Sequence, residues 1–452
     1  MTSRFGGITV SPARRTAIDI LQRVEAGGAF ASVLIAGIPE SSLSHRDRAL
    51  AHELVLGVLR WQKALDYFIE RYGQRPPEGL DLPVLMALRL GIYQLRYLSR
   101  IPASAAVNES VNLVRRARLA GAAGLVNAVL RRAARSLSDA PGEGISDSLE
   151  KLAVEVSHPA WMLERWSNAF GSAEAAALAL ANNRAPQAAF RINTLLLSDS
   201  ERALAALHQN GVNTRPSVIA PGAFVAEHAA ALGSSDLTRR GWIYIQDEAS
   251  QLVSLALRVE PGQRVLDLCA APGSKTSHIA ALAGGDVMIV ACDLHLHRLA
   301  TLISICSKLG AGSVSAVTLD GTRSLPFLVH APKFDRVLVD APCTGTGTLR
   351  ANPEIKWRLS LDDVNRIART QLELLRQGAE VLETGARLVY STCSIEAEEN
   401  ERVVEKFLEG GAPFKIIKPE MSADLMTADG FIRTFPHRHG CDGFFAAVLE
   451  RW

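Results

Sequence analysis

Two cysteines and an aspartate follow predicted strands, and their types suggest covalent chemistry on an electrophilic ring. Asp340 and Cys343 lie in the segment DAPCTGTG, directly after the apolar run VLV. Cys393 lies in the segment STCS, directly after the run RLVY. Because open α/β sheets bind ligands at the carboxyl ends of their strands, we expect these three side chains at one site. A thiolate supplies a strong nucleophile there, and a carboxylate can stabilise charge on the ring.

A further loop is predicted to hold a nucleoside cofactor. The segment DLCAAPGSKT begins at Asp267, at the end of an apolar run, and leads into a predicted helix. Its small residues let the backbone approach a ligand, and the helix N-terminus offers free N–H donors. Asp293 ends the next predicted strand about 20 residues later, where an acid can bind a ribose diol. Asp320 follows the third strand and could reach an adenine amino group, although either aspartate could instead cap a helix or a turn.

The loop is neither a G-x-G-x-x-G motif nor a P-loop. A pyrophosphate cradle normally uses more glycine, which makes a dinucleotide or ATP less favoured. S-adenosylmethionine, a nucleoside cofactor without phosphates, fits the loop better. No other cofactor is expected.

These loops need a mostly parallel sheet to position them. From residue 241 onward, apolar runs alternate with helical stretches, which is typical of a βαβ series covered by helices on both faces. A late strand is expected over 443–449. The other predicted strands are 264–268, 287–292, 314–319, 336–339 and 387–390.

The front of the chain has a different pattern, with helical apolar spacing throughout residues 11–138. The predicted helices are 14–26, 44–59, 83–96, 105–118 and 124–135. Residues 136–148 have the composition of a linker. A small mixed domain follows, with helices near 159–170, 173–182 and 200–209 and a strand at 189–193. The expected organisation is therefore 1–138, 148–240 and 241–452.

Composition indicates a large globular protein and narrows its setting. A chain of 452 residues suggests about three domains, and 48% hydrophobic residues can build large cores. No apolar run approaches the roughly 18 residues of a membrane helix, and the first residues lack a signal peptide pattern, so we expect a cytoplasmic protein. The six cysteines include no Cys-x-x-Cys pair, which argues against structural zinc, and no metal is expected.

Charge is distributed unevenly along the chain. The net charge is only +2, yet Lys and Arg clearly outnumber Asp and Glu over residues 1–138. A basic front end suggests an anionic polymer as partner, while solvated helix faces would give the same count.

The front end resembles the NusB family of small helical RNA-binding proteins. The resemblance is carried by LGIYQL from Leu90, VNESV from Val107 and LVNAVLR from Leu125. It implies that basic residues of these helices contact RNA phosphates, and it assigns RNA binding to the first domain. The residues it points to are Arg14, Arg15, Arg115, Arg116 and Arg118.

The two catalytic loops resemble those of the RNA 5-methylcytosine methyltransferases. DxCAAPGxKT, DAPCTGTG and YSTCSIxxxENE match in order, together with QDEAS, NPEIKW and DGFF. With the NusB-like front end, the chain is identified as similar to one bacterial branch, the RsmB (Sun/Fmu) type, which methylates a cytosine of 16S ribosomal RNA. The resemblance implies a Rossmann-like class I methyltransferase domain with a mostly parallel seven-stranded sheet, preceded by an all-α NusB-like domain and a small α+β connecting domain. Ser274 departs from the pattern, since the family usually has glycine there.

The resemblance also implies roles for individual residues. Cys393 falls on the nucleophile, Cys343 on the second cysteine needed for product release, and Asp340 beside them. Lys356 is a possible RNA or cofactor contact, with a solvated surface position as the alternative. The cofactor contacts fall on Cys269, Ala270, Ala271, Pro272, Gly273, Ser274, Lys275, Asp293, Asp320 and Asp340.

The chemistry explains why a thiol is needed. Carbon 5 of cytosine is a poor nucleophile, and addition of a thiolate at carbon 6 makes it able to accept the methyl group from a sulfonium. DNA cytosine methyltransferases resemble this chain at Pro342 and Cys343 and use that cysteine, whereas the RNA family uses the one matching Cys393. The RNA-family context favours Cys393. A paired base must be unstacked to reach these groups, so splayed-out or single-stranded RNA is the expected substrate.

Two other functional classes remain as alternatives. A nicotinamide-dependent oxidoreductase would use the same sheet and Asp293 but leaves both cysteines without a role. A non-catalytic RNA-binding assembly factor would be expected to lack a key thiol or loop, whereas Cys393, Cys343 and Asp340 are all present. Methylation of tRNA instead of ribosomal RNA would preserve the chemistry. We expect a monomer that binds RNA, not DNA, and does not bind membranes.

Overall fold

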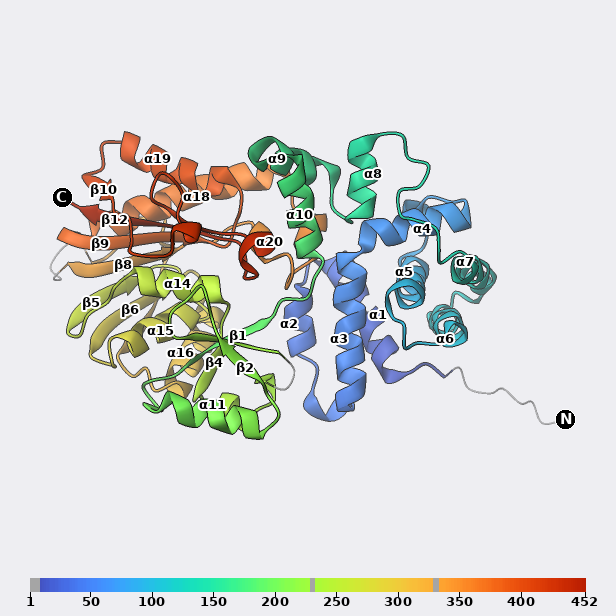
Figure 1. Ribbon diagram of the computed structural model, residues 1–452, viewed down its shortest axis with the longest axis horizontal. Coiled ribbons are helices and arrows are strands. Elements are labelled where there is room, and N and C mark those ends of the chain that lie inside the picture. The colour runs from blue at the N-terminus through green and yellow to red at the C-terminus, as the bar shows by residue number, and fades with distance from the viewer. Residues whose placement is uncertain (1–8, 228–231, 328–332) are drawn as a thin grey trace. The chain divides into compact units, whose positions relative to one another are not determined.

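The computed structural model describes residues 9–227, 232–327 and 333–452, and the chain divides into two compact units (Figure 1). The helical unit comprises Met1–Ala185 and Leu349–Arg358. The sheet unit comprises Pro186–Thr348 and Leu359–Trp452. Among the described residues, no helix has both the length and the apolar character that crossing a bilayer requires.

The helical unit is built around one core of buried aliphatic and aromatic side chains. Its helices confirm the all-α front end expected from the sequence. Ser44 begins α3 as a cap, accepting a hydrogen bond of 3.1 Å from the N–H of Asp47. The helices are α1 (Pro12–Gly27), α2 (Ala31–Ala36), α3 (His45–Arg60), α4 (Gln62–Gly73), α5 (Leu82–Tyr97), α6 (Ala103–Arg116), α7 (Ala123–Arg135), α8 (Ser148–Glu155), α9 (Ala160–Phe170), α10 (Ser172–Asn182) and α17 (Ile355–Arg358).

The connection between α7 and α8 is pinned to the helical unit. Its composition suggested a linker, but Tyr67 on α4 donates a 2.6 Å hydrogen bond to the carbonyl of Glu143. Tyr72 on the same helix donates to Asp139 at 3.0 Å, and Arg71 forms an ion pair with Glu143 at 2.9 Å. The polar residues of this segment therefore act as hydrogen-bond partners of α4.

A second feature of the helical unit is the late segment Leu349–Arg358, which lies among the N-terminal helices. Glu354 accepts a 2.7 Å hydrogen bond from the N–H of Ala31, and Trp357 donates one of 2.7 Å to the carbonyl of Leu59. Arg358 donates to three carbonyls, among them that of Val24 at 2.6 Å. The segment thus completes the fold of helices that precede it by some three hundred residues.

The sheet unit begins with a small antiparallel sheet of four strands in the order β2-β3-β1-β4. Phe190 on β1 stacks on Phe224 of β3, and α11 covers the sheet with Ala203 and Leu207. Its elements are β1 (Ala188–Ile192), β2 (Thr214–Pro216), β3 (Ala223–Ala226), β4 (Ile243–Ile245), α11 (Ser200–Gln209) and α13 (Asp236–Arg239).

The large sheet has the order β10-β12-β9-β8-β5-β6-β7, with β11 paired to β12 as an eighth strand. The five strands from β9 to β7 are parallel, and β10, β11 and β12 pair in antiparallel fashion. This arrangement confirms the mostly parallel sheet expected from the sequence. The strands are β5 (Gln263–Asp267), β6 (Val287–Asp293), β7 (Val314–Thr318), β8 (Phe334–Asp340), β9 (Leu382–Thr392), β10 (Phe414–Ile416), β11 (Ile432–Thr434) and β12 (Phe444–Arg451).

Helices cover both faces of this sheet (Figure 1). Leu338 faces the core formed with α14, α15 and α16, whereas its neighbours Val337 and Val339 face the core formed with α18 and α19. Burial on both faces explains why the strands read as continuous apolar runs. The helices are α14 (Glu248–Ala256), α15 (Ser274–Leu282), α16 (Leu296–Lys308), α18 (Leu361–Glu380), α19 (Glu401–Glu409) and α20 (Pro436–His439).

Candidate functional site

The neighbouring parallel strands β8 and β9 bring the two predicted cysteines together. Asp340, the last residue of β8, pairs in register with Ser391 of β9. Because both strands end at the same edge, the loops that follow them meet, and the Sγ atoms of Cys343 and Cys393 lie 3.1 Å apart. Both cysteines are free thiols with partly exposed side chains. The sequence prediction that one site contains both thiols and Asp340 is consistent with this geometry.

The contact makes the two thiols different from each other. Its hydrogen bond with Cys393 and its burial raise the pKa of Cys343 well above the usual value for a thiol, and nearby Glu399 adds to the effect. Cys343 therefore keeps its proton at neutral pH. A protonated Cys343 can donate to Cys393, which is the arrangement that a thiolate at Cys393 requires.

A buried carboxylate, Glu399, holds both cysteine loops in place. Its Oε2 accepts a 2.9 Å hydrogen bond from the N–H of Thr344, the residue after Cys343. Its Oε1 accepts from the hydroxyl of Thr344 and, at 2.7 Å, from that of Ser394, the residue after Cys393. Gln371 of α18 donates to the same carboxylate at 3.0 Å and to the carbonyl of Pro342 at 2.9 Å. A single side chain thus fixes the separation of the two thiols.

A close backbone approach completes this clamp. The N–H of Gly347 donates to the carbonyl of Cys393 at 2.9 Å, and the N–H of Gly443 donates to the carbonyl of Gly347 at 2.9 Å. A Cβ at position 347 would lie 1.9 Å from the carbonyl oxygen of Gly443, so only glycine fits there. This explains the final glycine of DAPCTGTG and ties it to the DGFF segment.

Asp340 is paired with the lysine of the cofactor loop. Lys275 Nζ lies 2.7 Å from Asp340 Oδ2, and the hydroxyl of Ser391 donates to Asp340 Oδ1 at 2.8 Å. Burial opposes the charge on Lys275, but the attraction and hydrogen bond of Asp340 outweigh it, and the pKa of Lys275 is raised. Lys275 therefore keeps its charge despite its burial, and Lys275 and Ser391 together hold the side chain of Asp340 in place.

Asp267, at the end of β5, has one oxygen without a hydrogen-bond partner among the described residues. Thr276 donates to Oδ2 at 2.7 Å, while Oδ1 is buried and unpaired. Burial raises the pKa of Asp267 to about 7, and the charges of Asp340 and Asp293 contribute to that increase. A buried unpaired acceptor at the end of the central strand fits a site for a ligand that supplies a donor.

The predicted cofactor loop lies between β5 and α15. The N–H of Ala270 donates to the carbonyl of Cys292 at 2.8 Å, and Gly273 has a φ of 104°, which favours glycine at the start of α15. Its Cβ would also lie 3.0 Å from Leu302 of α16. The loop Cys269–Lys275 is therefore held close to the ends of β5 and β6.

The two remaining predicted cofactor aspartates take part in local contacts. Asp293 is 4% exposed; it accepts from the N–H of His295 at 3.0 Å and forms an ion pair with Arg298 at 3.3 Å. Asp320 accepts from the N–H and hydroxyl of Thr322 and pairs with Arg323 at 3.1 Å. Those hydrogen bonds from Thr322 lower the pKa of Asp320. Asp293 and Asp320 lie at the ends of adjacent strands β6 and β7, as the sequence predicted, and their cofactor roles stay predictions.

Two of the predicted RNA-binding residues are buried, which contradicts that role for them. Arg14 is 7% exposed and donates to Gln94 at 2.6 Å. Lys356 is 1% exposed, and its Nζ donates to the carbonyls of Arg60 and Ser157, each at 2.8 Å. Neither side chain reaches the surface. Their hydrogen-bond partners lie on neighbouring segments that are distant in the sequence. The side chains of Arg15, Arg115, Arg116 and Arg118 are exposed.

Sequence reasoning gave no role to Glu399, Gln371 or Ser391. Glu399 belongs to the ENE segment that carried the family resemblance, and that segment was its only signal. Gln371 sits in the middle of a long amphipathic helix, and no sequence signal pointed to it.

Cys292 and Cys306 are buried, and burial raises the pKa of Cys292 to about 12 and that of Cys306 to about 11. No group of metal-binding side chains occurs within the described residues.

Comparison with known families matches three parts of the chain. The model described as "16S rRNA methyltransferase RsmB/F" matches residues 254–450. The NusB family matches residues 11–135, and a ferredoxin-like domain of RsmF/B-like methyltransferases matches residues 158–232.

Similar proteins cover nearly the whole chain. Two named "Probable ribosomal RNA small subunit methyltransferase B" come from Bacillus subtilis and from Synechocystis. The first is 32% identical over 97% of this chain and 98% of its own, and the second is 35% identical over 97% and 99%. The solved structure titled "Crystal Structure of PH0851" is 27% identical, covers 98% of this chain and 99% of its own, and has a TM-score of 0.84.

Proposed function

The chain belongs to the 16S rRNA methyltransferase RsmB/F family, and we propose that it methylates carbon 5 of a cytosine in 16S rRNA through a covalent adduct on Cys393. S-adenosylmethionine is the proposed methyl donor. The observation that carries the proposal is the pair of free thiols, with Sγ atoms 3.1 Å apart, at the ends of β8 and β9, where Asp340 pairs with Lys275. A donor-binding methyltransferase that used no covalent step would need neither thiol.

Cys393 is the proposed nucleophile. Its thiolate adds to carbon 6 of cytosine, and the electrons of the carbon 5–carbon 6 double bond become available at carbon 5. Carbon 5 then takes the methyl group as the donor's sulfur–carbon bond breaks. The raised pKa of Cys343 supports this assignment, because the thiol that keeps its proton is the weaker nucleophile.

Cys343 is the proposed base for the second half of the reaction. Its pKa is raised chiefly by the contact with Cys393. When the Cys393 sulfur is bonded to carbon 6 it carries no negative charge, so Cys343 can release its proton to water and accept the carbon 5 proton as a thiolate. Removal of that proton restores the double bond and breaks the Cys393–carbon 6 bond. This path accounts for a second cysteine that product release requires.

Asp340 is the proposed contact to the pyrimidine edge. Lys275 and Ser391 hold its carboxylate at 2.7 and 2.8 Å, so it can accept a hydrogen bond from the exocyclic amine of cytosine without reorganising. The residues proposed to hold the donor are Cys269–Lys275, Asp293 and Asp320, with the unpaired Oδ1 of Asp267 added by the structure.

The test is methyl transfer with a donor labelled in the methyl group and 16S rRNA as substrate. We expect label in 5-methylcytidine after digestion to nucleosides, with release of tritium from RNA labelled at cytosine carbon 5. Label in a different nucleoside would refute the carbon 5 chemistry. Label only in tRNA would refute the ribosomal substrate while preserving the chemistry, and the absence of any thermal shift with S-adenosylhomocysteine would favour a non-catalytic scaffold.

A further inference from the structure

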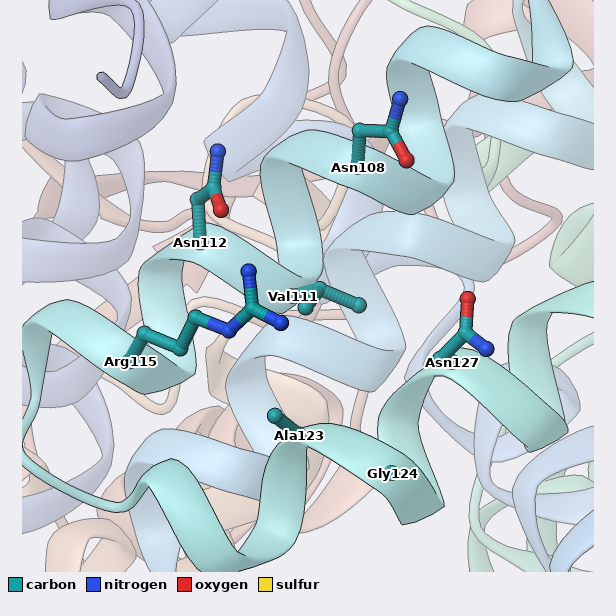
Figure 2. A pocket seen from close by; sticks show the side chains of 7 residues that line it. All are labelled: Asn108, Val111, Asn112, Arg115, Ala123, Gly124 and Asn127. Carbon is teal, nitrogen blue, oxygen red and sulfur yellow. The ribbon is translucent and has the colours of Figure 1, made fainter. Parts of the chain in front are cut away.

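Helices α6 and α7 of the helical unit form two adjoining grooves, each of about 440 Å³. The first is lined by polar side chains of both helices: Asn108, Asn112 and Arg115 from α6 and Asn127 from α7. In Figure 2, Arg115 extends over the space between the helices, and Asn127 stands on the opposite wall. The second groove shares Asn108 and adds Arg131 and Arg135. The two grooves therefore adjoin at Asn108, the first with a mostly polar lining and the second with a more apolar one.

The surface around the two grooves is positively charged. From Ala103 to Arg135 the sequence contains six arginines and a single acidic residue, Glu109. Glu109 does not offset that charge, because it accepts a 2.9 Å hydrogen bond from the N–H of Ser11 and lies 3.7 Å from Arg14. The three arginines of the grooves are all exposed.

The asparagines are oriented by neighbouring groups. Arg131 donates to Asn127 Oδ1 at 3.1 Å, which leaves the Asn127 amide N–H groups to donate. Asn112 donates to the carbonyl of Thr9 at 3.1 Å, which leaves its oxygen to accept. Asn127 thus offers a donor and Asn112 an acceptor, the two kinds of group that a nucleobase edge can pair with.

We propose that the two grooves bind consecutive nucleotides of single-stranded RNA, with the arginines on phosphates and the asparagines on base edges. The proposal rests on RNA being the substrate. A volume of about 440 Å³ lies within the range of pockets for small organic groups, so each groove can accept one splayed-out nucleotide. Duplex RNA is disfavoured, because side chains cannot reach the bases in its narrow major groove. An acidic peptide would also engage the arginines, and it is an outcome that the test separates from RNA.

The test measures binding of the full chain to a 16S rRNA fragment by filter retention over a range of salt concentrations. The double variant Asn108→Ala/Asn127→Ala should weaken binding about tenfold or more, because each base contact contributes discrimination of that order. Arg115→Ala should reduce the slope of log affinity against log salt by about 0.7, the value for one phosphate of a single strand. For both variants, the thermal shift with S-adenosylhomocysteine should stay as in the parent chain, so that the loss appears in the RNA affinity alone.

Controls separate the grooves from general charge. Arg116→Ala removes the neighbouring charge on α6 outside both grooves, and Arg46→Ala removes an exposed charge on α3. Arg116→Ala should lower the affinity less than Arg115→Ala, and Arg46→Ala should leave it unchanged. Ultraviolet crosslinks between the unmodified chain and RNA should map to peptides of α6 and α7.

Two results would overturn the proposal. In the first, the groove variants bind RNA as tightly as the parent chain and the crosslinks map to other peptides. In the second, the substitutions weaken binding of an acidic peptide but not of RNA. Failure of the proposed function gives a different pattern: crosslinks at α6 and α7 with no 5-methylcytidine formed. If every groove variant still methylates RNA and binds it as tightly as the parent chain, the groove proposal is refuted while the proposed function stands.

Discussion

The Sγ atoms of Cys343 and Cys393 lie 3.1 Å apart, and this contact is the largest cause of the raised pKa of Cys343. A disulfide would require about 2.05 Å, so the two sulfurs are neighbours without a bond. The protonation of Cys343 therefore depends on Cys393. Replacing them one at a time should give different results.

Cys393→Ala should abolish methyl transfer and any covalent RNA adduct, because the proposed nucleophile is lost. Cys343→Ala should still form the adduct on Cys393 but fail to release it, so an RNA–protein band should accumulate on a denaturing gel. Cys306→Ala, a buried thiol of α16 away from the cysteine loops, is the control and should turn over like the parent chain. An exchange of the two outcomes would reverse the roles of the cysteines.

Glu399→Gln should separate the two cysteine loops. An amide cannot accept from all four donors that Glu399 now receives, so one or two buried hydrogen bonds are lost, at about 1–3 kcal/mol. A misplacement of the thiols by about 1 Å should lower kcat roughly 100-fold, with unchanged binding of S-adenosylhomocysteine by calorimetry. Glu405→Gln, the same change at an exposed position of α19, should leave kcat unaltered. An unaltered kcat in Glu399→Gln would show that the carboxylate does not position the thiols.

Gly347→Ala should disturb the loop after β8, which contains Cys343. The new Cβ would collide with the backbone of Gly443 and lie 2.9 Å from the carbonyl oxygen of Cys393, so the backbone must shift. We expect at least a 100-fold loss of kcat with a lower thermal midpoint, as for other overpacked sites. Gly312→Ala meets no atom within 4 Å and is the matched control. If Gly347→Ala is as active as the Gly312→Ala control and the parent chain, the backbone contact between Gly347 and Gly443 does not position the loop.

Asp267→Asn should change how stability depends on pH. The folded pKa of about 7 is raised above the ordinary value of 3.8. Below pH 3.8 the carboxyl is protonated in both states. Between pH 3.8 and pH 7 this carboxyl ionises only in the unfolded chain. The free energy of unfolding therefore falls by up to about 4 kcal/mol as the pH rises. The urea midpoint of the variant, relative to that of the parent chain, should therefore rise between pH 5 and pH 8.

A parallel pH dependence of the Asp267→Asn variant and the parent chain would contradict the raised pKa. Asp286→Asn supplies the matched control, since it makes the same change at a loop position before β6 and should leave the parent pH dependence intact.

Lys356→Met should destabilise the helical unit. The lysine Nζ donates to three acceptors, and an apolar side chain of similar length leaves the carbonyls of Arg60 and Ser157 and the amide of Asn183 without a donor. Burial lowers the pKa of Lys356 well below its usual value, with the charge of Arg60 adding to the effect. We expect a loss of about 2–4 kcal/mol, from two or three unsatisfied buried groups.

Thermal unfolding of the full chain, monitored by circular dichroism at the helical band, measures the Lys356→Met loss. Lys406→Met on the exposed face of α19 should leave the midpoint unchanged. An equal midpoint for Lys356→Met and the parent chain would show that the three acceptors are satisfied by water.

The sequence predicted that the two cysteine loops meet because their signals are local. An apolar run followed at once by Asp340 or Cys393 marks a strand end, and parallel strands end at one edge, so the meeting of the two loops follows from the pattern. The clamp by Glu399 did not follow, since nothing in a buried carboxylate's local sequence says which donors surround it. The 3.1 Å separation of the sulfurs depends on that clamp.

Lys356 and Arg14 show why surface roles are harder to predict. Lysine and arginine are rarely buried, so exposure is the natural expectation for both. The partners that bury them come from residues 60, 157 and 183 for Lys356, and from residue 94 for Arg14. Sequence patterns carry no information about such distant partners. The prediction of the fold class does not depend on these residues, because it rests on periodicity and on the motifs that carry the family resemblance.

The route of the backbone limits how this protein can be divided. The chain passes from one unit to the other near residues 185, 348 and 358. A fragment that starts at residue 186 would therefore carry Leu349–Arg358 with its apolar and hydrogen-bonding groups bare, and removal of the front end is not a neutral truncation. A single cut therefore cannot separate the two units, because the chain returns to the helical unit at Leu349–Arg358 after it has entered the sheet unit.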